Sequence, residues 1–247
     1  MNGRQREILK TVTIDREITV NQLAQKFDIS AVTIRQDLNY LESERFLKRV
    51  HGGVTFTDSD DISNRLAVNY ESKLKIAQKA SSFVSAGETI LIEAGSTNTI
   101  LAKEVSKEEG ITIITPNIFI ARECSRSKKN NVIILGGVYQ KESESLIGPL
   151  VKICIDHVNF KKAFIGVDGF TRETGFTSKD MMRAELSVYI ARKSEQVFIL
   201  TDSSKFGKIE LTELIGPNEI NYVITDSSIP QRDKVFLEGK GVNVIVV

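Results

Sequence analysis

Residues 19–54, TVNQLAQKFDISAVTIRQDLNYLESERFLKRVHGGV, decide the fold of the N-terminal part of the chain. Thr19 and Gln22 have the spacing of a helix capping box, in which each side chain bonds the backbone N–H of the other residue. A turn of three residues, 28–30, separates two apolar stripes, and Ser30 can cap the second helix. The stripes have helical spacing and consist of Val20, Leu23, Ala24 and Phe27, then Ile34, Leu38 and Leu41. The stretch therefore predicts a helix-turn-helix.

The outward face of the second predicted helix carries side chains that suit base reading, namely Thr33, Arg35, Gln36 and Asn39. Arg can donate two hydrogen bonds to guanine, Gln or Asn can pair with adenine, and Thr can reach phosphate or a thymine methyl. Residues 46–54 then resemble a β-wing, in which Lys48 and Arg49 meet the phosphate backbone and Gly52-Gly53 permits a tight reversal. The alternative is an amphipathic hairpin with a solvated charged face. The order of cap, stripe, turn and basic wing favours DNA binding.

Composition and charge limit the other classes of function. Of the 247 residues, 41% are hydrophobic and 26% are charged, which is typical of a globular protein. The net charge of +1 gives no global attraction to nucleic acid, so local clustering must supply it. Two cysteines are too few for a disulfide framework or a zinc site, and we expect Cys124 and Cys154 to be buried. No long apolar segment occurs, so we expect a cytoplasmic protein. We also expect it to hold no metal and no cofactor.

A second block follows a stretch rich in Asp and Ser, 56–64, which favours turns. Short apolar runs recur there and alternate with helix-period segments, one of which places Met182, Leu186, Tyr189 and Ile190 on a single face. The runs are 89–93, 111–115, 132–135, 163–167, 197–201, 222–225 and 242–247. Such runs indicate parallel strands covered on both faces. The sequence thus predicts an α/β protein with a DNA-binding domain at 1–55, a linker at 56–70, and a larger Rossmann-like, mainly parallel α/β domain at 71–247.

The first domain resembles the DNA-binding domain of the DeoR family. The resemblance rests on the recognition-helix motif Thr33-Ile34-Arg35-Gln36-Asp37-Leu38 combined with the wing motif His51-Gly52-Gly53. Gln36 stands where a second Arg is usual, and Arg45 where Gly is usual, so the preferred base sequence is expected to differ. The candidate DNA-binding residues are Thr19, Ser30, Thr33, Arg35, Gln36, Asn39, Lys48, Arg49, His51 and Gly52.

Loops at the ends of several predicted strands suit an anionic ligand. Residues 94–98, AGSTN, join a strand to a helix and offer backbone N–H groups, hydroxyls and a helix dipole. Glycine-containing loops follow three more strands, at 136–137, 166–169 and 202–207. In an open parallel sheet such loops converge on one crevice. Lys205 could supply a charge for phosphate, and Asp168 could accept bonds from sugar hydroxyls; the alternative is a set of ordinary turns and a surface lysine.

These segments are similar to the C-terminal sensor domain of the DeoR family, which is related to phosphosugar isomerases. The match includes the EAGST loop, Leu135-Gly136-Gly137, Gly148-Pro149 and Glu185. The resemblance implies binding of a phosphorylated sugar or a related metabolite. Glu93 stands where Asp is usual, Asn98 where Thr is common and Ser187 where Lys is usual. The candidate effector-binding residues are Gly95, Ser96, Thr97, Asn98, Gly136, Gly137, Asp168, Gly169, Glu185 and Lys205.

Together these features predict a sequence-specific transcription regulator, a repressor of carbohydrate metabolism genes that responds to a sugar phosphate. The double-stranded operator would be bound by a homodimer or homotetramer, because such modules work in two-fold pairs. One alternative is a phosphosugar isomerase or deaminase that carries a DNA-binding domain. Its weakness is that His157 has no evident catalytic neighbour, although carboxylates could serve as acid and base. Another is a DNA binder without an effector, which the size of the second domain disfavours.

Overall fold

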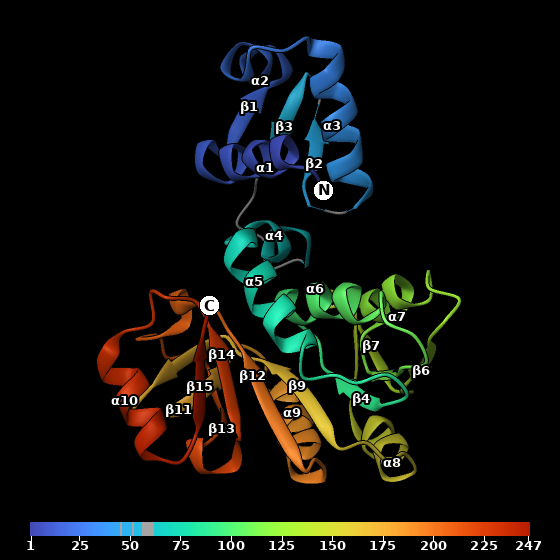
Figure 1. The fold of residues 1–247 in the computed structure, drawn as a ribbon, viewed down its shortest axis with the longest axis vertical. Helices are drawn as coiled ribbons and strands as arrows, with labels where there is room; N and C mark the ends of the chain where they lie inside the picture. The colour runs from blue at the N-terminus through green and yellow to red at the C-terminus, as the bar shows by residue number, and fades with distance from the viewer. Residues whose placement is uncertain (45, 51, 56–61) are drawn as a thin grey trace. The chain divides into compact units, whose positions relative to one another are not determined.

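The computed structural model describes residues 1–44, 46–50, 52–55 and 62–247, and these form two compact units, residues 1–70 and 71–247 (Figure 1). Arg45, a departure from the family pattern, and His51, a candidate DNA contact, lie outside the described residues. In the described part of the chain, no helix has the length and apolar character needed to cross a membrane.

Unit 1 is a winged helix-turn-helix, which confirms the predicted fold. Its three short strands form an antiparallel sheet in the order β1-β3-β2. Both predicted caps are present: Thr19 and Gln22 form a capping box at the start of α2, and the Ser30 hydroxyl accepts a bond from the Thr33 N–H. The elements are α1 (Gly3–Asp15), β1 (Glu17–Thr19), α2 (Val20–Phe27), α3 (Ala31–Ser43), β2 (Lys48–Val50), β3 (Gly53–Thr55) and α4 (Ile62–Ala67).

The core of unit 1 gathers the apolar stripes of its first three helices and one side chain of the wing. Each of these side chains is at most 1% exposed, and they are Ile8, Leu9, Val12, Leu23, Ile34, Leu38, Leu41 and Val54. Asp28 adopts the left-handed conformation that ends α2, with φ 52°, and so turns the chain within three residues. Of the predicted linker, residues 56–61 lie outside the described part, whereas residues 62–67 form α4.

Unit 2 is built on a seven-stranded parallel sheet in the order β15-β14-β12-β9-β4-β5-β6. All seven predicted strands are present in it, with ends shifted by at most one residue. All of its pairings are parallel, which confirms the predicted mainly parallel α/β domain. The strands are β4 (Thr89–Ile92), β5 (Thr112–Thr115), β6 (Asn131–Ile134), β9 (Lys162–Gly166), β12 (Gln196–Leu200), β14 (Tyr222–Thr225) and β15 (Asn243–Val246).

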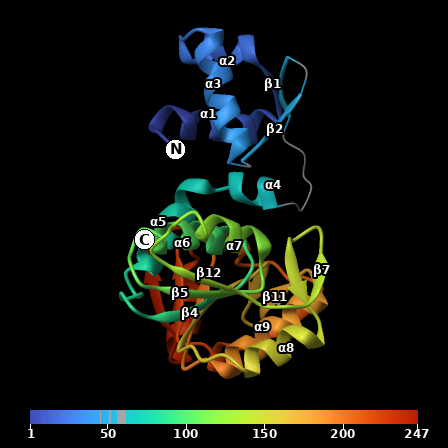
Figure 2. The same cartoon turned by 90° about the vertical axis from the view of Figure 1, so that its right-hand side faces the viewer.

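Helices cover both faces of this sheet. Figures 1 and 2 show α5, α6 and α7 on one side and α8 and α9 on the other. The five inner strands are buried on both sides, since neighbours such as Ile90 and Leu91 point to opposite faces and neither is exposed. The helices are α5 (Tyr70–Ser81), α6 (Ser96–Val105), α7 (Ile118–Cys124), α8 (Pro149–Asp156), α9 (Met181–Lys193) and α10 (Gln231–Gly239).

Five further strands were not expected from the sequence. β7 (Val138–Gln140) and β8 (Ser145–Ile147) form an antiparallel hairpin. β10 (Gly169–Thr171), β11 (Gly175–Ser178) and β13 (Thr212–Ile215) form a small antiparallel sheet. β7 follows β6 and β10 follows β9, so both additions begin at the edge formed by the carboxyl ends of the main strands.

Two predictions about burial in unit 2 are wrong. Met182 does not share the buried face of α9 but is 42% exposed, and Arg183 and Ser187 occupy that face with Leu186 and Ile190. Cys154 is only half-buried, whereas Cys124 is buried as expected. Both errors follow from assigning burial by apolar character alone.

Candidate functional site

The outer face of α3 presents the side chains expected to read bases. Arg35, Gln36 and Asn39 are exposed, whereas Ile34 and Leu38 on the inward face of the same helix are fully buried. The helix begins at a cap in which the Ser30 hydroxyl lies 3.1 Å from the Thr33 backbone nitrogen and 2.9 Å from the Thr33 hydroxyl. The cap therefore fixes the N-terminal turn of α3, which is the part of a recognition helix that approaches base edges.

Val32 in that first turn is 61% exposed, and the sequence reasoning did not single it out. Exposure of a large apolar side chain to water is unfavourable, but on a recognition helix such a side chain can pack on a thymine methyl. Its position next to Thr33, outside the inward stripe, was the available signal.

The other expected DNA contacts surround α3. Thr19 caps α2, where its hydroxyl accepts from the Gln22 N–H at 3.2 Å. Lys48 on β2 and Gly52 at the turn of the wing are exposed, and Gly52 has the positive φ of 79° that the reversal needs. Gly53 has a different constraint, because a Cβ there would stand 2.5 Å from the Ile18 carbonyl oxygen.

Arg49 faces the recognition helix. Its guanidinium donates to the side-chain oxygen of Asn39, and its backbone N–H donates to the Glu42 carboxylate at 3.1 Å. The Asn39 amide thus has its oxygen engaged and its NH2 group left for DNA. A free Asn pairs with adenine through both atoms, so this contact favours a donor-only role for Asn39.

The effector candidates lie mainly where the order of strands in unit 2 reverses. β4 and β9 are neighbours, but the chain continues from β4 toward β5 and β6, and from β9 toward β12, β14 and β15. Ligands of open parallel sheets bind beyond the carboxyl ends of the strands at such a point. Gly166 is the last residue of β9, and Gly95 lies in the loop after β4, in close contact with it. A Cβ on Gly166 would stand 3.1 Å from the Ala94 carbonyl oxygen.

Helix α6 begins at this point with Gly95 as its cap, at φ 142°, and with no side-chain cap bond. Ser96, Thr97 and Asn98 form its buried first turn. The Asn98 amide donates to the carbonyl oxygens of Glu93 at 2.9 Å and Phe164 at 3.0 Å, which ties β4 to β9. The first turn of α6 therefore offers backbone N–H groups and a positive dipole end to an anion.

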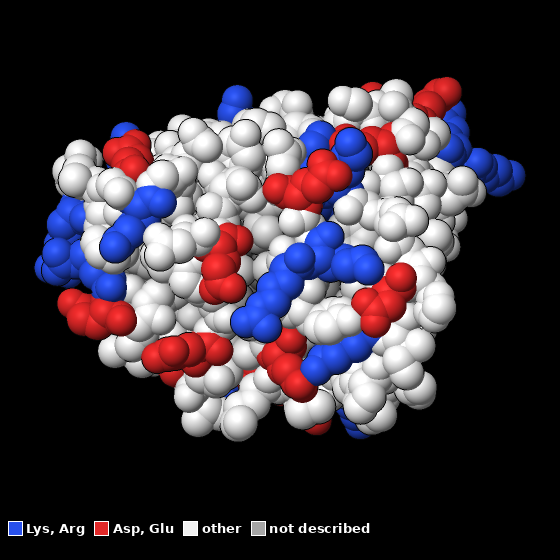
Figure 3. Space-filling model, turned by 90° about the horizontal axis from the view of Figure 1, so that it is seen from below, with Lys and Arg blue, Asp and Glu red and all other residues white. Residues whose placement is uncertain are grey.

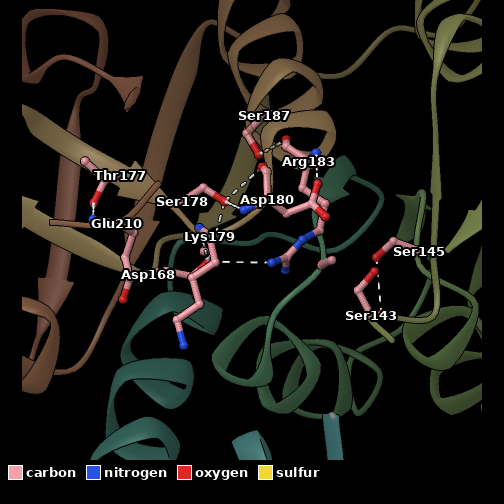
Figure 4. A network of polar contacts seen from close by, with 12 residues as sticks. Ser143, Ser145, Asp168, Thr177, Ser178, Lys179, Asp180, Arg183, Ser187 and Glu210 are labelled. Atoms are coloured by element: carbon pink, nitrogen blue, oxygen red, sulfur yellow. Dashed lines mark hydrogen bonds and ion pairs between the residues drawn. The ribbon is translucent and has the colours of Figure 1, made fainter. Parts of the chain in front are cut away.

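Asp168, which follows β9, is buried and is held in place by α9 and the residues before it. Its carboxylate accepts from the Lys179 N–H at 3.2 Å and lies 3.6 Å from the Arg183 guanidinium (Figure 4). Asp180 caps α9 through the Arg183 N–H at 2.8 Å. A negative and a positive side chain are thus brought together beside the start of α6.

Two buried polar atoms at this place lack a hydrogen-bond partner among the described residues. They are the Asn98 side-chain oxygen and the Arg183 Nε. Buried polar atoms are normally bonded, because leaving one unpaired costs about 1–3 kcal/mol. We call Glu93, residues 95–98, Asp168 and Arg183 the switch-point site.

Glu93 gives this site an unusual electrostatic character. Burial raises the pKa of its carboxyl to about 7, although Arg183 and the Gly166 N–H oppose the rise. The Gly166 N–H donates to the carboxyl at 3.2 Å. Near neutral pH this carboxyl is therefore present in both its protonated and its charged form.

The structure does not bring every candidate into the switch-point site. Glu185 is exposed on α9 and forms an ion pair with Lys152 of α8. Gly136 and Gly137 pack on α8, and a Cβ on Gly137 would stand 2.5 Å from a methyl carbon of Val151. Glu185 and Gly137 have structural surroundings that account for them without a ligand, whereas Gly136 has room for a Cβ.

Gly169 and Lys205 lie on the other side of the site. Gly169 begins β10 against the Lys208 carbonyl oxygen, 2.5 Å from where a Cβ would stand. Lys205 stands beyond β12 next to Asp202, a carboxyl that burial would tend to protonate. Lys73 of α5, Ser204 and Lys205 outweigh that effect and lower the pKa of Asp202.

Sequence reasoning missed Arg183 and noted Glu93 and Ser187 only as departures from the family pattern. Arg183 is buried, and Ser187 donates to its carbonyl oxygen at 2.9 Å. The available signal was Asp180, whose place before an apolar-periodic segment is typical of a helix cap. It would have placed Arg183 in the first turn of a helix.

Comparisons with known proteins cover nearly the whole chain. The DeoR-like helix-turn-helix domain matches residues 4–60, and the DeoR C terminal sensor domain matches residues 68–227. The HTH-type transcriptional regulator GolR of Listeria innocua is 32% identical over 92% of this chain and 91% of its own length. The Lactose phosphotransferase system repressor of Lactococcus lactis is 28% identical over 96% of each chain.

Among solved structures, ribose 5-phosphate isomerase A from Methanocaldococcus jannaschii is similar over 56% of this chain and 55% of its own, with a TM-score of 0.42 and 19% identity. The family models and the relatives decide the class of protein, since both relatives are regulators and match along almost their entire length. The chain belongs to the DeoR family and is a transcriptional regulator, not an enzyme.

Proposed function

We propose that this regulator represses genes of carbohydrate metabolism and releases its operator when a phosphorylated sugar or a related metabolite binds the switch-point site. The observation that carries the proposal is the pair of unpartnered buried atoms, the Asn98 oxygen and the Arg183 Nε, beside the start of α6. A ligand that bonds both atoms would recover the free energy that is lost when polar atoms are buried without a partner.

The chemistry of the site suits such a ligand. The N–H groups of the first turn of α6, at Ser96 and Thr97, and the positive end of that helix attract a phosphate. Asp168 is a charged acceptor for sugar hydroxyls, and Glu93 near neutrality can accept or donate a bond. Among the relatives, the Lactococcus lactis protein is named for a sugar transport system, which agrees with a sugar-derived effector.

In the DNA-binding unit, we assign base contacts to Arg35 and Gln36 and a donor contact to Asn39. Phosphate contacts fall to the helix caps Thr19 and Ser30, to Thr33, and to the wing, whose contributors are Lys48, Arg49, His51 and Gly52. Two copies would place two recognition helices in successive major grooves of a palindromic operator. The protein would act in the cytoplasm, where the operator is found.

The effector test is operator binding at one fixed salt concentration, measured against a panel of sugar phosphates. We expect one of them to weaken binding. Ser96→Asp places a carboxylate at the anion end of α6, so it should abolish the response and keep operator affinity. Ser82→Asp is the matched control, because it adds the same charge at an exposed position after α5. A normal response in Ser96→Asp would remove the switch-point site from the proposal.

The DNA test uses Arg35→Ala on operators that differ at single base pairs. Loss of a bidentate guanine contact costs about 1–3 kcal/mol at one base pair and relaxes specificity there. Lys48→Ala should instead weaken binding to all sequences equally, as for a phosphate contact. Uniform weakening by Arg35→Ala as well would show that Arg35 does not read a base.

A further inference from the structure

One face of unit 2 exposes large apolar side chains from four elements. They come from the edge strand β6, from β7 and from the helices α8 and α9. Five of them lie on the side of the sheet that α8 and α9 cover and are 39–64% exposed, namely Ile133, Val138, Leu150, Ile153 and Met181. We call these five residues the β6–α9 face. Monomeric proteins rarely leave a continuous apolar surface of this kind in water.

Contacts between the elements show that this surface is continuous. A Cβ on Gly148, at the start of α8, would stand 3.9 Å from a methyl carbon of Val138, and one on Gly136 would stand 3.6 Å from the Cys154 sulfur. The first contact joins β7 to α8, and the second joins the end of β6 to α8. Helices α8 and α9 lie side by side (Figure 2), since Tyr189 of α9 donates to Asp156 of α8 at 2.7 Å.

Helix α8 is apolar on two opposite sides. Val151 and Ile155 point into the core and are not exposed at all. Leu150 and Ile153, on the other side, are 59% and 53% exposed. An apolar side of a helix is normally buried, so the exposed apolar side of α8 has the character of a surface that a partner covers.

Strand β6 ends the main sheet, and within the described part of the chain no strand pairs with its outer edge. Residues 131–137, NVIILGG, contain no charge and no proline. Natural proteins protect such an edge with lysine, proline or a covering element, because it otherwise pairs with another chain. Here the edge adjoins the β6–α9 face, so one partner could cover both.

We infer that the β6–α9 face is the surface through which two copies of this chain associate about a two-fold axis. A second copy is the occupant that the regulator requires, because helix-turn-helix modules read operators in two-fold pairs. A two-fold interface uses the same patch twice and must be self-complementary, which an uncharged apolar face and an unpaired strand edge both are. Five such side chains supply several hundred Å² per copy, roughly the scale of one side of a standard interface. The inference rests on the two-fold operator binding of the proposed function.

This face is also connected to the effector. Met181 is the first residue of α9, and the Asp180 cap before it accepts a bond from Gln140 of β7. The same first turn of α9 carries Arg183, which lies beside Asp168 in the switch-point site. A ligand that moves Arg183 therefore acts on the helix that borders the second copy, and so on the spacing of the two DNA-binding units.

The test is sedimentation velocity of the full chain over a range of concentrations, without DNA or effector. We expect a dimer or a larger even assembly for the natural chain. Ile153→Glu buries a charge in the interface and should raise the dissociation constant about tenfold or more. Val235→Glu is the matched control, because Val235 is 56% exposed on a helix, α10, at the opposite edge of the sheet. It should leave association unchanged.

Circular dichroism melting checks that each variant folds, and Leu150→Glu replaces Ile153→Glu if the latter unfolds. A natural chain that stays monomeric overturns the inference, as does unchanged association in a folded Ile153→Glu or Leu150→Glu. Equal dissociation by Val235→Glu also overturns it. These results need no effector, so failure here is distinct from failure of the effector proposal, which the metabolite panel decides.

Discussion

Asp37 is a buried carboxylate on the recognition helix itself, and its role is to hold that helix. It is 3% exposed and accepts bonds from Arg4 Nε at 2.6 Å and from the Gln5 amide at 3.0 Å, which ties α3 to the start of α1. The motif residues of α3 thus divide into outward readers and one inward anchor.

We expect Asp37→Ala to lower the melting temperature of unit 1 by roughly 5–10 °C, because it removes three hydrogen bonds between helices, two from Arg4 and one from Gln5. Thermal unfolding followed by circular dichroism measures this. Glu7→Ala, on the exposed side of α1, serves as the control and should change little. Equal melting of the two variants would show that the anchor is dispensable.

Glu93 makes the stability of unit 2 depend on pH. Its pKa rises from 4.5 to about 7 on folding, so the folded state holds a proton that the unfolded state releases. The stabilisation is complete below pH 4.5 and is lost as the pH rises through about 7. A shift of this size corresponds to roughly 3 kcal/mol.

Glu93→Gln should remove that dependence, because the amide keeps the shape of the side chain but does not titrate. Urea unfolding of unit 2, measured at a series of pH values, should give a flatter profile for the variant and higher stability than the natural chain above pH 7. Parallel profiles for the two proteins would mean that Glu93 ionises normally. Glu213→Gln in β13, an exposed carboxyl, is the control.

Among the elements, the loop between β6 and β7 shows how packing can imitate a binding motif. Its two glycines resemble a ligand loop in the sequence, but the structure gives them different surroundings. A Cβ on Gly137 would stand 2.8 Å from the Ile147 carbonyl oxygen as well as against Val151, whereas one on Gly136 would meet only the Cys154 sulfur at an ordinary distance.

Gly137→Ala should therefore destabilise unit 2 by about 1–3 kcal/mol through overpacking, and Gly136→Ala should be close to neutral. Urea unfolding compares the two variants directly. Effector binding by folded Gly136→Ala should also remain normal. A loss of effector binding without a loss of stability would restore the loop to the site.

The strands of unit 2 differ in how well the sequence predicts them. All seven strands of the main sheet coincide with apolar runs, and burial on both faces demands such runs in the five inner strands. β10 and β11 have no such run: they are short, contain Gly169 and Gly175, and pair with each other. β11 also pairs with β13, whose residues are 34–39 positions further along the chain, so the local pattern carries little signal for this sheet.

The switch-point site shows the same limit. The strand-end loop 95–98 was predictable, since a small-residue turn between a strand and a helix has a known role. Arg183 was not, because helical periodicity assigns charged residues to the outside. Its burial depends on Asp168 and Glu93, which reach it only through the folded sheet.

At the scale of the whole molecule, charge alone does not direct the protein to DNA. The net charge is +1, and on the face seen in Figure 3 basic and acidic side chains are interspersed without a continuous field of one sign. Attraction to DNA must therefore come from the few basic side chains of unit 1, and control must come from coupling between the two sites and between copies.

Such coupling is reciprocal. If a sugar phosphate lowers operator affinity by some factor, the operator must lower sugar phosphate affinity by the same factor, commonly about 5–150-fold. Gln140→Ala removes the bond between β7 and the Asp180 cap of α9, so it should reduce this factor while each ligand alone binds with nearly its natural affinity. Calorimetric titration of the effector with and without operator measures it. Gln231→Ala, at the exposed start of α10, should keep the natural factor. An unaltered factor in Gln140→Ala would show that the signal does not pass through the start of α9, because no other change in that variant would compensate for the lost bond.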